Sequence, residues 1–253
     1  MRTIRIYCPQ PLEAGTTISA GPDIANYVGR VLRLKTGDQI QLFNGEGYDV
    51  RATIQQLERK DASLYLEERI SLDTESNLKV TLGQVISRGD RMDYAVQKAV
   101  ELGVNMIAPL TSERCEVRLD DNRKEKRRSH WQQVVISACE QSGRAVVPEV
   151  TEVQQVESWL QSIQADLKLI LHPYDHPEGN KPEHVTSLWQ DNNQDPETIA
   201  LLIGPEGGFA EAEVALAETH GFRRLCLGPR VLRTETAPIV GISYLQCTWG
   251  DFK

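Results

Sequence analysis

Hydrophobic and polar residues alternate in short runs over residues 1 to about 72, which is the period of β-strands. Clusters of turn-forming residues at 36–38 and 44–47 separate these runs. A helix is expected just after Pro22. The predicted elements are strands at 2–7, 39–43, 48–54 and 63–67, and one helix at 23–31. Short, evenly spaced strands predict a small N-terminal β-barrel over residues 1–72.

Beyond a polar linker at residues 73–78, the pattern changes to buried strands that alternate with amphipathic helices. The predicted strands are 79–87, 104–110, 167–171, 198–203 and 224–227, and the predicted helices are 90–103, 123–142, 211–220 and 237–248. Such alternation is typical of a mainly parallel sheet with helices on both faces. The fold class is therefore an α+β two-domain chain, with an α/β domain over residues 79–253.

The net charge of −8 argues weakly against a nucleic-acid partner, but the cations are clustered. One cluster lies within residues 1–35 and a second at 123–128. Local basic patches on an acidic chain can still hold RNA phosphates, and a solvated charged surface is the alternative. The candidate RNA-binding residues are Arg2, Arg5, Arg30, Arg33, Lys35, Arg127, Arg128 and Arg144.

The five cysteines form no CxxC pair and the histidines have no metal-ligand spacing, so we expect reduced thiols and no metal. The longest apolar run, near residues 199–203, is far too short to span a bilayer. These features predict a cytoplasmic protein with no membrane partner.

Three segments with candidate chemistry each follow a predicted strand, at 171–175, 202–209 and 227–238. Ligands of open parallel sheets bind at the carboxyl ends of the strands, so the three loops are expected to share one crevice. The first segment alone could be an ordinary turn. In the third, Thr234 or Thr236 is expected to cap the following helix.

The glycine-rich segment Gly204-Pro205-Glu206-Gly207-Gly208 allows a ligand to approach the backbone closely. A phosphate-binding loop is the rival interpretation, but the segment lacks the Gly-Lys-Ser/Thr signature and Glu206 would repel a phosphate. A neutral or cationic ligand fits better. S-adenosylmethionine, with an uncharged adenosine and a positive sulfonium, has this character.

The segments at 204–209 and 227–237 resemble the knotted SPOUT methyltransferases, and in particular the RsmE family, the N3-methyluridine transferases of bacterial 16S rRNA. The resemblance extends to residues 31–38, 97–103 and 138–144. It implies a PUA-like RNA-binding barrel, an α/β domain with a C-terminal trefoil knot, a homodimer, and S-adenosylmethionine bound within the knot. The implied substrate is one specific uridine of 16S rRNA in the small ribosomal subunit.

Within this framework, Arg233 is the candidate for contacting a uracil carbonyl oxygen, and Glu235 or Glu206 is the candidate base or sulfonium neighbour. The expected cofactor-binding residues are Leu171, His172, Ile203, Gly204, Pro205, Glu206, Gly207, Gly208, Leu227, Gly228, Leu232, Thr234 and Ala237. A salt bridge between Arg233 and Glu235 is the alternative for that pair. A non-catalytic RNA-binding or ribosome-assembly protein with a methyltransferase-like fold is the alternative function.

Overall fold

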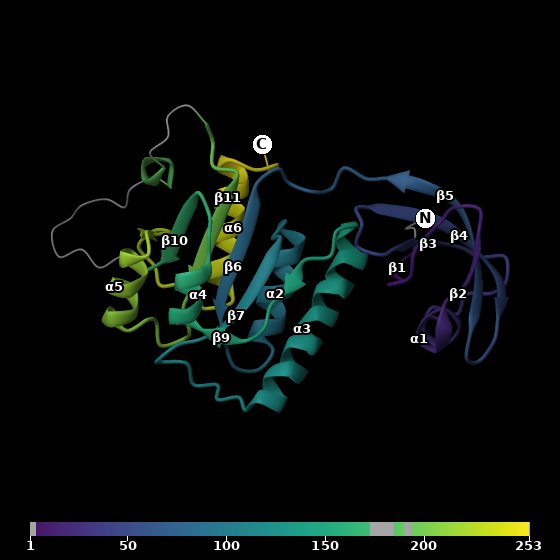
Figure 1. Cartoon of the computed structure of the whole chain (residues 1–253), viewed down its shortest axis with the longest axis horizontal. Helices are drawn as coiled ribbons and strands as arrows, with labels where there is room; N and C mark the ends of the chain where they lie inside the picture. The colour runs from purple at the N-terminus through teal and green to yellow at the C-terminus, as the bar shows by residue number, and fades with distance from the viewer. Residues whose placement is uncertain (1–3, 173–184, 190–193, 253) are drawn as a thin grey trace. The chain divides into compact units, whose positions relative to one another are not determined.

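The computed structural model describes residues 4–172, 185–189 and 194–252. The chain divides into two compact units, each with its own sheet (Figure 1). The first comprises Met1–Glu75 together with Ile136–Val147, and the second comprises Ser76–Val135 and Pro148–Lys253. Residues 136–142 are the last turns of a long helix, Asp121–Ser142, and a continuous helix carries no local signal that its last turns join another unit.

The first unit contains a five-stranded sheet in the order β1-β3-β4-β5-β2. Its strands are β1 (Arg5–Tyr7), β2 (Thr17–Ser19), β3 (Gln39–Phe43), β4 (Tyr48–Leu57) and β5 (Ala62–Ser71). The β1–β3 pair is parallel and the other pairs are antiparallel. Alternate β4 residues, including Val50, Ala52 and Ile54, are fully buried in the core of this unit, as the period-2 pattern predicts.

The single helix predicted at 23–31 is two segments in the structure. α1 (Gly21–Asn26) is followed by a π-helical turn, Tyr27–Val31. The Leu32 N–H donates to the Tyr27 carbonyl at 2.9 Å, which closes the wider turn. β2 was not predicted, because three residues are too few to show a period.

The second unit contains a seven-stranded sheet in the order β12-β10-β11-β6-β7-β8, with β9 also pairing with β7. The strands are β6 (Lys79–Val85), β7 (Met106–Thr111), β8 (Glu149–Val150), β9 (Gln154–Gln155), β10 (Leu167–Leu171), β11 (Thr198–Ile203) and β12 (Phe222–Leu225). All of these pairings are parallel, which confirms the predicted parallel core.

Helices cover both faces of this sheet (Figure 1). They are α2 (Arg91–Glu101), α3 (Asp121–Ser142), α4 (Val156–Ser162), α5 (Glu211–Thr219) and α6 (Thr236–Thr248), with a short 3-10 helix at Val185–Leu188. Ala200 and Leu202 of β11 belong to the core cluster formed with α4 and α5. Leu201, between them, lies against Gly241 of α6 on the opposite face. No helix of the described residues is long and apolar enough to cross a membrane.

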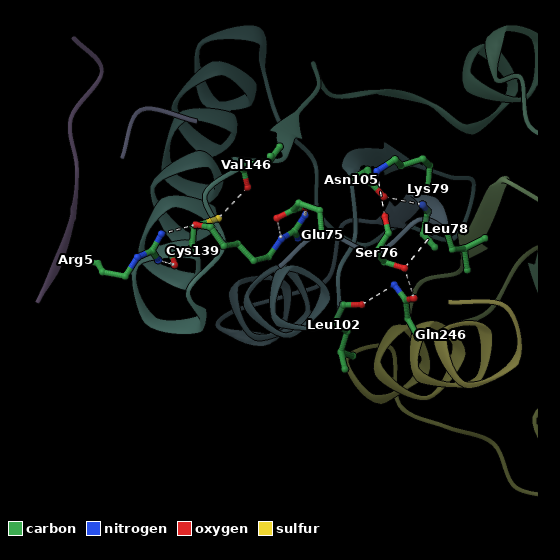
Figure 2. A network of polar contacts seen from close by, with 12 residues as sticks. Arg5, Glu75, Ser76, Leu78, Lys79, Leu102, Asn105, Cys139, Val146 and Gln246 are labelled. Carbon is green, nitrogen blue, oxygen red and sulfur yellow. Dashed lines mark hydrogen bonds and ion pairs between the residues drawn. The ribbon is translucent and has the colours of Figure 1, made fainter. Parts of the chain in front are cut away.

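A buried polar network fixes α6 within the second unit (Figure 2). Gln246 is fully buried, accepts a hydrogen bond from Ser76 Oγ at 2.8 Å and donates to the Leu102 carbonyl at 3.1 Å. The amide therefore joins the C-terminal helix to the residues before β6 and to the end of α2. Both polar ends of Gln246 are satisfied, as burial requires.

At the start of α2, Asp90 occupies the N-cap position, with a helical backbone and no side-chain capping bond. The capping prediction for α6 is wrong. Neither Thr234 nor Thr236 caps α6, because the N-cap residue is Glu235 and it makes no side-chain capping bond either. The hydroxyl of Thr234 is used between loops instead, as described below.

Candidate functional site

The described parts of the three predicted loops converge because their strands are neighbours; of the first loop, only Leu171 and His172 are described, and residues 173–175 lie outside the described residues. β10 lies between β11 and β12 in the sheet, and all three strands run in the same direction. The segments that follow them line one cavity of about 500 Å³, a size typical of small-ligand sites. The segment after β6, which is paired with β11, contributes Arg91 to the same cavity.

The glycine-rich loop after β11 has a backbone that requires two of its glycines. Gly208 has a φ of 68°, in the left-handed region, and its N–H donates to the Pro205 carbonyl at 2.9 Å. A Cβ at Gly204 would lie 3.0 Å from the ring of Phe209. A side chain at either position would thus distort the wall of the cavity.

The buried carboxylate of Glu213 holds the end of this loop. It accepts the Ala210 N–H at 2.9 Å, at the start of α5, and the Glu113 N–H at 2.9 Å. One side chain therefore satisfies a free donor at the helix start and a donor from the segment after β7.

Thr234 links the third loop to the second. Its hydroxyl donates to the Gly204 carbonyl at 3.0 Å and accepts a hydrogen bond from Gln84 Nε2 at 3.2 Å. Gln84 lies on β6 and is fully buried. This chain of bonds fixes the spacing of two cavity walls that are thirty residues apart in sequence.

Glu206 is a fixed anion at the cavity wall. Its carboxylate accepts hydrogen bonds from Arg91 Nη1 at 2.9 Å and from the Arg88 N–H at 3.3 Å. Partial burial opposes ionisation, but the backbone N–H groups of Glu206 and Arg88 and the Arg91 guanidinium outweigh it and lower the pKa. Glu206 is therefore ionised at neutral pH and already has its partners.

Glu235 differs from Glu206 because one of its oxygens is buried without a partner among the described residues. Its side chain is 17% exposed, and among the described residues its Oε2 is buried without a hydrogen bond. Arg233 Nη1 lies 3.9 Å from Oε1, and the Arg233 side chain is 79% exposed. The Arg233–Glu235 pair is thus long and involves only Oε1 of Glu235, which leaves Oε2 available to accept a hydrogen bond.

Every residue predicted for catalysis or cofactor binding lines this cavity. Phe209, Arg230 and Val231 lie in the predicted loops but were not assigned a role, and Arg91 lies outside those loops; the structure places all four in the lining. Arg91 follows a strand of the same parallel sheet, so the rule that located the three loops could have found it. Nothing in the sequence indicated a role for Val231, because an apolar residue in a loop is usually interpreted as packing against the core.

The chemistry of the lining fits S-adenosylmethionine. The walls combine glycine backbone with apolar side chains from Leu171, Ile203, Leu227 and Leu232, which suits an uncharged adenosine. Two carboxylates, Glu206 and Glu235, suit a positive sulfonium. Among the described residues no cluster of three potential metal ligands is found.

Of the predicted RNA-binding residues, Arg30, Arg33 and Lys35 are exposed in the first unit. Arg33 adopts a φ of 58°, the only left-handed non-glycine conformation in the part of the chain that the structure describes. Arg127 is exposed on α3, and Arg128 beside it pairs with Glu125 at 2.9 Å. Arg2 lies outside the described residues.

The structure corrects the prediction for Arg5 and Arg144, which have structural partners. Arg5 is 9% exposed and pairs with buried Asp49 at 2.6 Å. Arg144 is 4% exposed and pairs with Glu75 at 2.5 Å. Both guanidinium groups belong to the first unit and neutralise carboxylates there. They are therefore not presented to a phosphate.

Comparison with known proteins agrees with this site. The family model for the RNA methyltransferase domain matches residues 74–246, and that for the RNA methyltransferase PUA domain matches residues 20–65. A ribosomal RNA small subunit methyltransferase E from Buchnera aphidicola is 35% identical, covering 100% of this chain and 99% of that protein. The chain belongs to the ribosomal RNA small subunit methyltransferase E family. The resemblance drawn from the motifs is confirmed at this level.

Other members of the methyltransferase E family show the same extent of likeness. The Bacillus subtilis protein of that name is 32% identical over 94% of this chain and 92% of its own. The Neisseria gonorrhoeae protein, solved with S-adenosylmethionine bound, has a TM-score of 0.89 and 39% identity, with 100% of both chains covered. A methyltransferase-like structure from Legionella pneumophila, also in complex with S-adenosylmethionine, has a TM-score of 0.90 and 40% identity, again over 100% of both chains.

Proposed function

We propose that this chain is an S-adenosylmethionine-dependent methyltransferase that methylates N3 of a specific uridine in 16S rRNA of the small ribosomal subunit. The observation that carries the proposal is the cavity lined by the described parts of the three loops, with a carboxylate oxygen at its wall that has no partner among the described residues. Whole-length relatives named as small-subunit rRNA methyltransferases support it, and so does the likeness of this chain to two solved structures with bound S-adenosylmethionine.

The cofactor is proposed to lie against the backbone of Gly204, Gly208, Leu227 and Leu232. When bound, it supplies a methyl group from its sulfonium, and the electron pair of the broken carbon–sulfur bond stays on sulfur. Glu206, held by Arg91, provides fixed negative charge at the cavity wall. Preorganised charge of this kind needs no rearrangement during the reaction.

Uridine N3 carries a proton that must leave before its nitrogen electron pair can bond to the methyl carbon. Glu235 is the better acceptor for this proton, because its Oε2 has no partner among the described residues. Glu206 is less suitable, because Arg91 and the Arg88 N–H already occupy it and its pKa is lowered. Arg233, which is highly exposed beside Glu235, is proposed to donate to a uracil carbonyl oxygen as negative charge develops there.

The first unit is proposed to act as a PUA-like barrel that binds RNA through Arg30, Arg33 and Lys35. The C-terminal segment of the second unit is proposed to form a trefoil knot, and the bonds of Thr234 to Gln84 and Gly204 support its passage between β6 and the loop after β11. We further propose that the active form is a homodimer.

The decisive experiment is methyl transfer to unmodified small ribosomal subunits with methyl-labelled S-adenosylmethionine, followed by digestion of the RNA to nucleosides. Label in N3-methyluridine is the expected result. Label in another nucleoside would refute the proposed base. If neither label nor cofactor binding is found, the non-catalytic RNA-binding alternative takes its place.

Glu235→Gln and Glu206→Gln form a matched pair for the proton acceptor. Loss of a general base typically lowers the rate about 100- to 10,000-fold, so Glu235→Gln should lower kcat on that scale with little change in the Kd for S-adenosylmethionine. Glu206→Gln should mainly raise that Kd, because it removes an ion pair that fixes the cavity wall. Equal kcat for Glu235→Gln and the wild type would exclude Glu235 as the acceptor.

A further inference from the structure

A second concave surface adjoins the cofactor cavity in the same unit. It encloses about 730 Å³, and its lining includes Arg88, Asp90, Arg91, Tyr94, Glu206 and Glu235. Arg91, Glu206 and Glu235 line both hollows. A molecule in the second hollow would therefore lie against the same side chains as a molecule in the first.

Tyr94 is the feature of this surface that packing does not explain. It lies in the first turn of α2 and is 47% exposed, although it is a large aromatic residue. The ammonium of Lys98, one turn later, lies 5.7 Å from the centre of its ring. An exposed aromatic ring beside a catalytic cavity is a platform on which a nucleobase can stack.

The charges of the hollow select against a phosphate and in favour of a neutral ring with an N–H donor. Four carboxylates, those of Asp90, Glu116, Glu206 and Glu235, line it against two arginines, Arg88 and Arg91. Arg88 pairs with Glu116 at 2.9 Å and Arg91 pairs with Glu206 at 2.9 Å, so the guanidinium charges are balanced. Glu235 Oε2, without a partner among the described residues, is left to accept a hydrogen bond from a ligand.

We propose that this second hollow is the acceptor-base site, where a pyrimidine turned out of the RNA stacks on Tyr94 and directs its N–H to Glu235. The inference rests on the proposed function and adds the place and the recognition of the base. Enzymes that modify a base inside structured RNA must expose it, and stacking on an aromatic ring offsets part of the lost base stacking. Because the two hollows share Arg91, Glu206 and Glu235, a base bound in the second hollow would lie directly beside the cofactor cavity.

The test compares Tyr94→Leu, which keeps an apolar side chain of moderate size, with Tyr94→Phe, which keeps the ring. On unmethylated small subunits, Tyr94→Leu should lower kcat/KM by about 10- to 100-fold, the range expected for one lost stacking contact. Tyr94→Phe should stay close to the wild type. The Kd for S-adenosylmethionine, measured by calorimetry without RNA, should be unchanged in both variants.

A binding readout independent of turnover uses RNA with 5-iodouridine at the methylated position, irradiated with the wild-type chain and S-adenosylhomocysteine. Peptide mass spectrometry should locate the crosslink at Tyr94 or in the first turn of α2. A crosslink confined to another part of the chain would overturn the assignment. So would a Tyr94→Leu variant with undiminished kcat/KM, or one whose oligomeric state is lost, since Tyr94 would then belong to a subunit interface.

These outcomes are separable from those of the proposed function. If the wild-type chain transfers no methyl group, the proposed function has failed before any variant is made. If the wild type methylates uridine and Tyr94→Leu is equally active, only the acceptor-base site has failed.

Discussion

Replacement of Arg5 by methionine tests whether this arginine serves the fold or the RNA. In the folded chain, Arg5 Nε and Nη2 donate to the two carboxylate oxygens of Asp49 at 2.6 and 2.8 Å. Its Nη1 and Nη2 also donate to the carbonyls of Cys139 and Arg144, at 2.7 and 3.1 Å. Methionine preserves the apolar stem of the side chain and removes all of these bonds.

The expected cost follows from burial. Asp49 is 1% exposed, so its carboxylate would stay buried without a counter-charge. Removal of one partner of a buried ion pair costs about 3–5 kcal/mol of unfolding free energy. The exposed pair Arg51–Glu68, with side chains 43% and 60% exposed, provides the matched control. Arg51→Met should cost about 0–1 kcal/mol, because solvent screens an exposed pair.

The assay is urea denaturation of the whole chain at neutral pH, followed by circular dichroism, with RNA affinity measured in parallel under native conditions. A second variant, Arg5→Met with Asp49→Leu, should recover part of the lost stability, because no buried carboxylate is then left unpaired. A cost for Arg5→Met as small as that for Arg51→Met, combined with a weaker salt dependence of RNA binding, would refute the structural assignment and restore Arg5 as a phosphate contact.

Three further predictions concern the cavity, a buried acid and the RNA surface. Thr234→Val removes the hydroxyl between Gln84 and Gly204 and leaves the buried Gln84 amide with one hydrogen bond fewer. It should lower the free energy of unfolding by about 1–3 kcal/mol and raise the Kd for S-adenosylmethionine measured by calorimetry. An unchanged Kd would mean that the loops keep their spacing without this hydroxyl. Burial raises the pKa of Glu140 above its usual 4.5, with the Tyr7 N–H and Arg5 opposing, so the folded state holds its proton longer than the unfolded state does. Its ionisation therefore lowers stability as pH rises past 4.5, and Glu140→Gln should raise the thermal midpoint at pH 7, with the gain vanishing below pH 4.5; a constant gain across that range would contradict the burial effect. Charge reversal of Arg30 and Arg33 should weaken RNA binding and reduce the salt slope by about 0.7–0.9 per lost phosphate contact, whereas an unchanged slope would mark a merely solvated surface.

The sequence determined the local elements wherever hydrophobic periodicity was strong. The strands 39–43, 167–171 and 198–203 agree with the structure to the residue, because the first alternates polar and apolar residues, the other two are largely buried runs, and all are bounded by polar or turn-forming residues. The rule for parallel sheets then located the site, since the residues that follow neighbouring strands must meet at one edge. The role of the glycines in the second loop could also be predicted from the sequence, because it depends on the local backbone conformation and not on distant residues.

Only the tertiary structure decided which polar side chains face a ligand and which face the protein. Arg5 meets Asp49 across 44 positions and Arg144 meets Glu75 across 69, so a basic residue that looks free along the chain is neutralised in the fold. The two candidate glutamates are alike in sequence, but Glu206 is paired with Arg91, whereas Oε2 of Glu235 is buried without a partner among the described residues. Burial, desolvation and charge pairing depend on neighbours in space. A local sequence pattern cannot predict which residues distant along the chain these neighbours are.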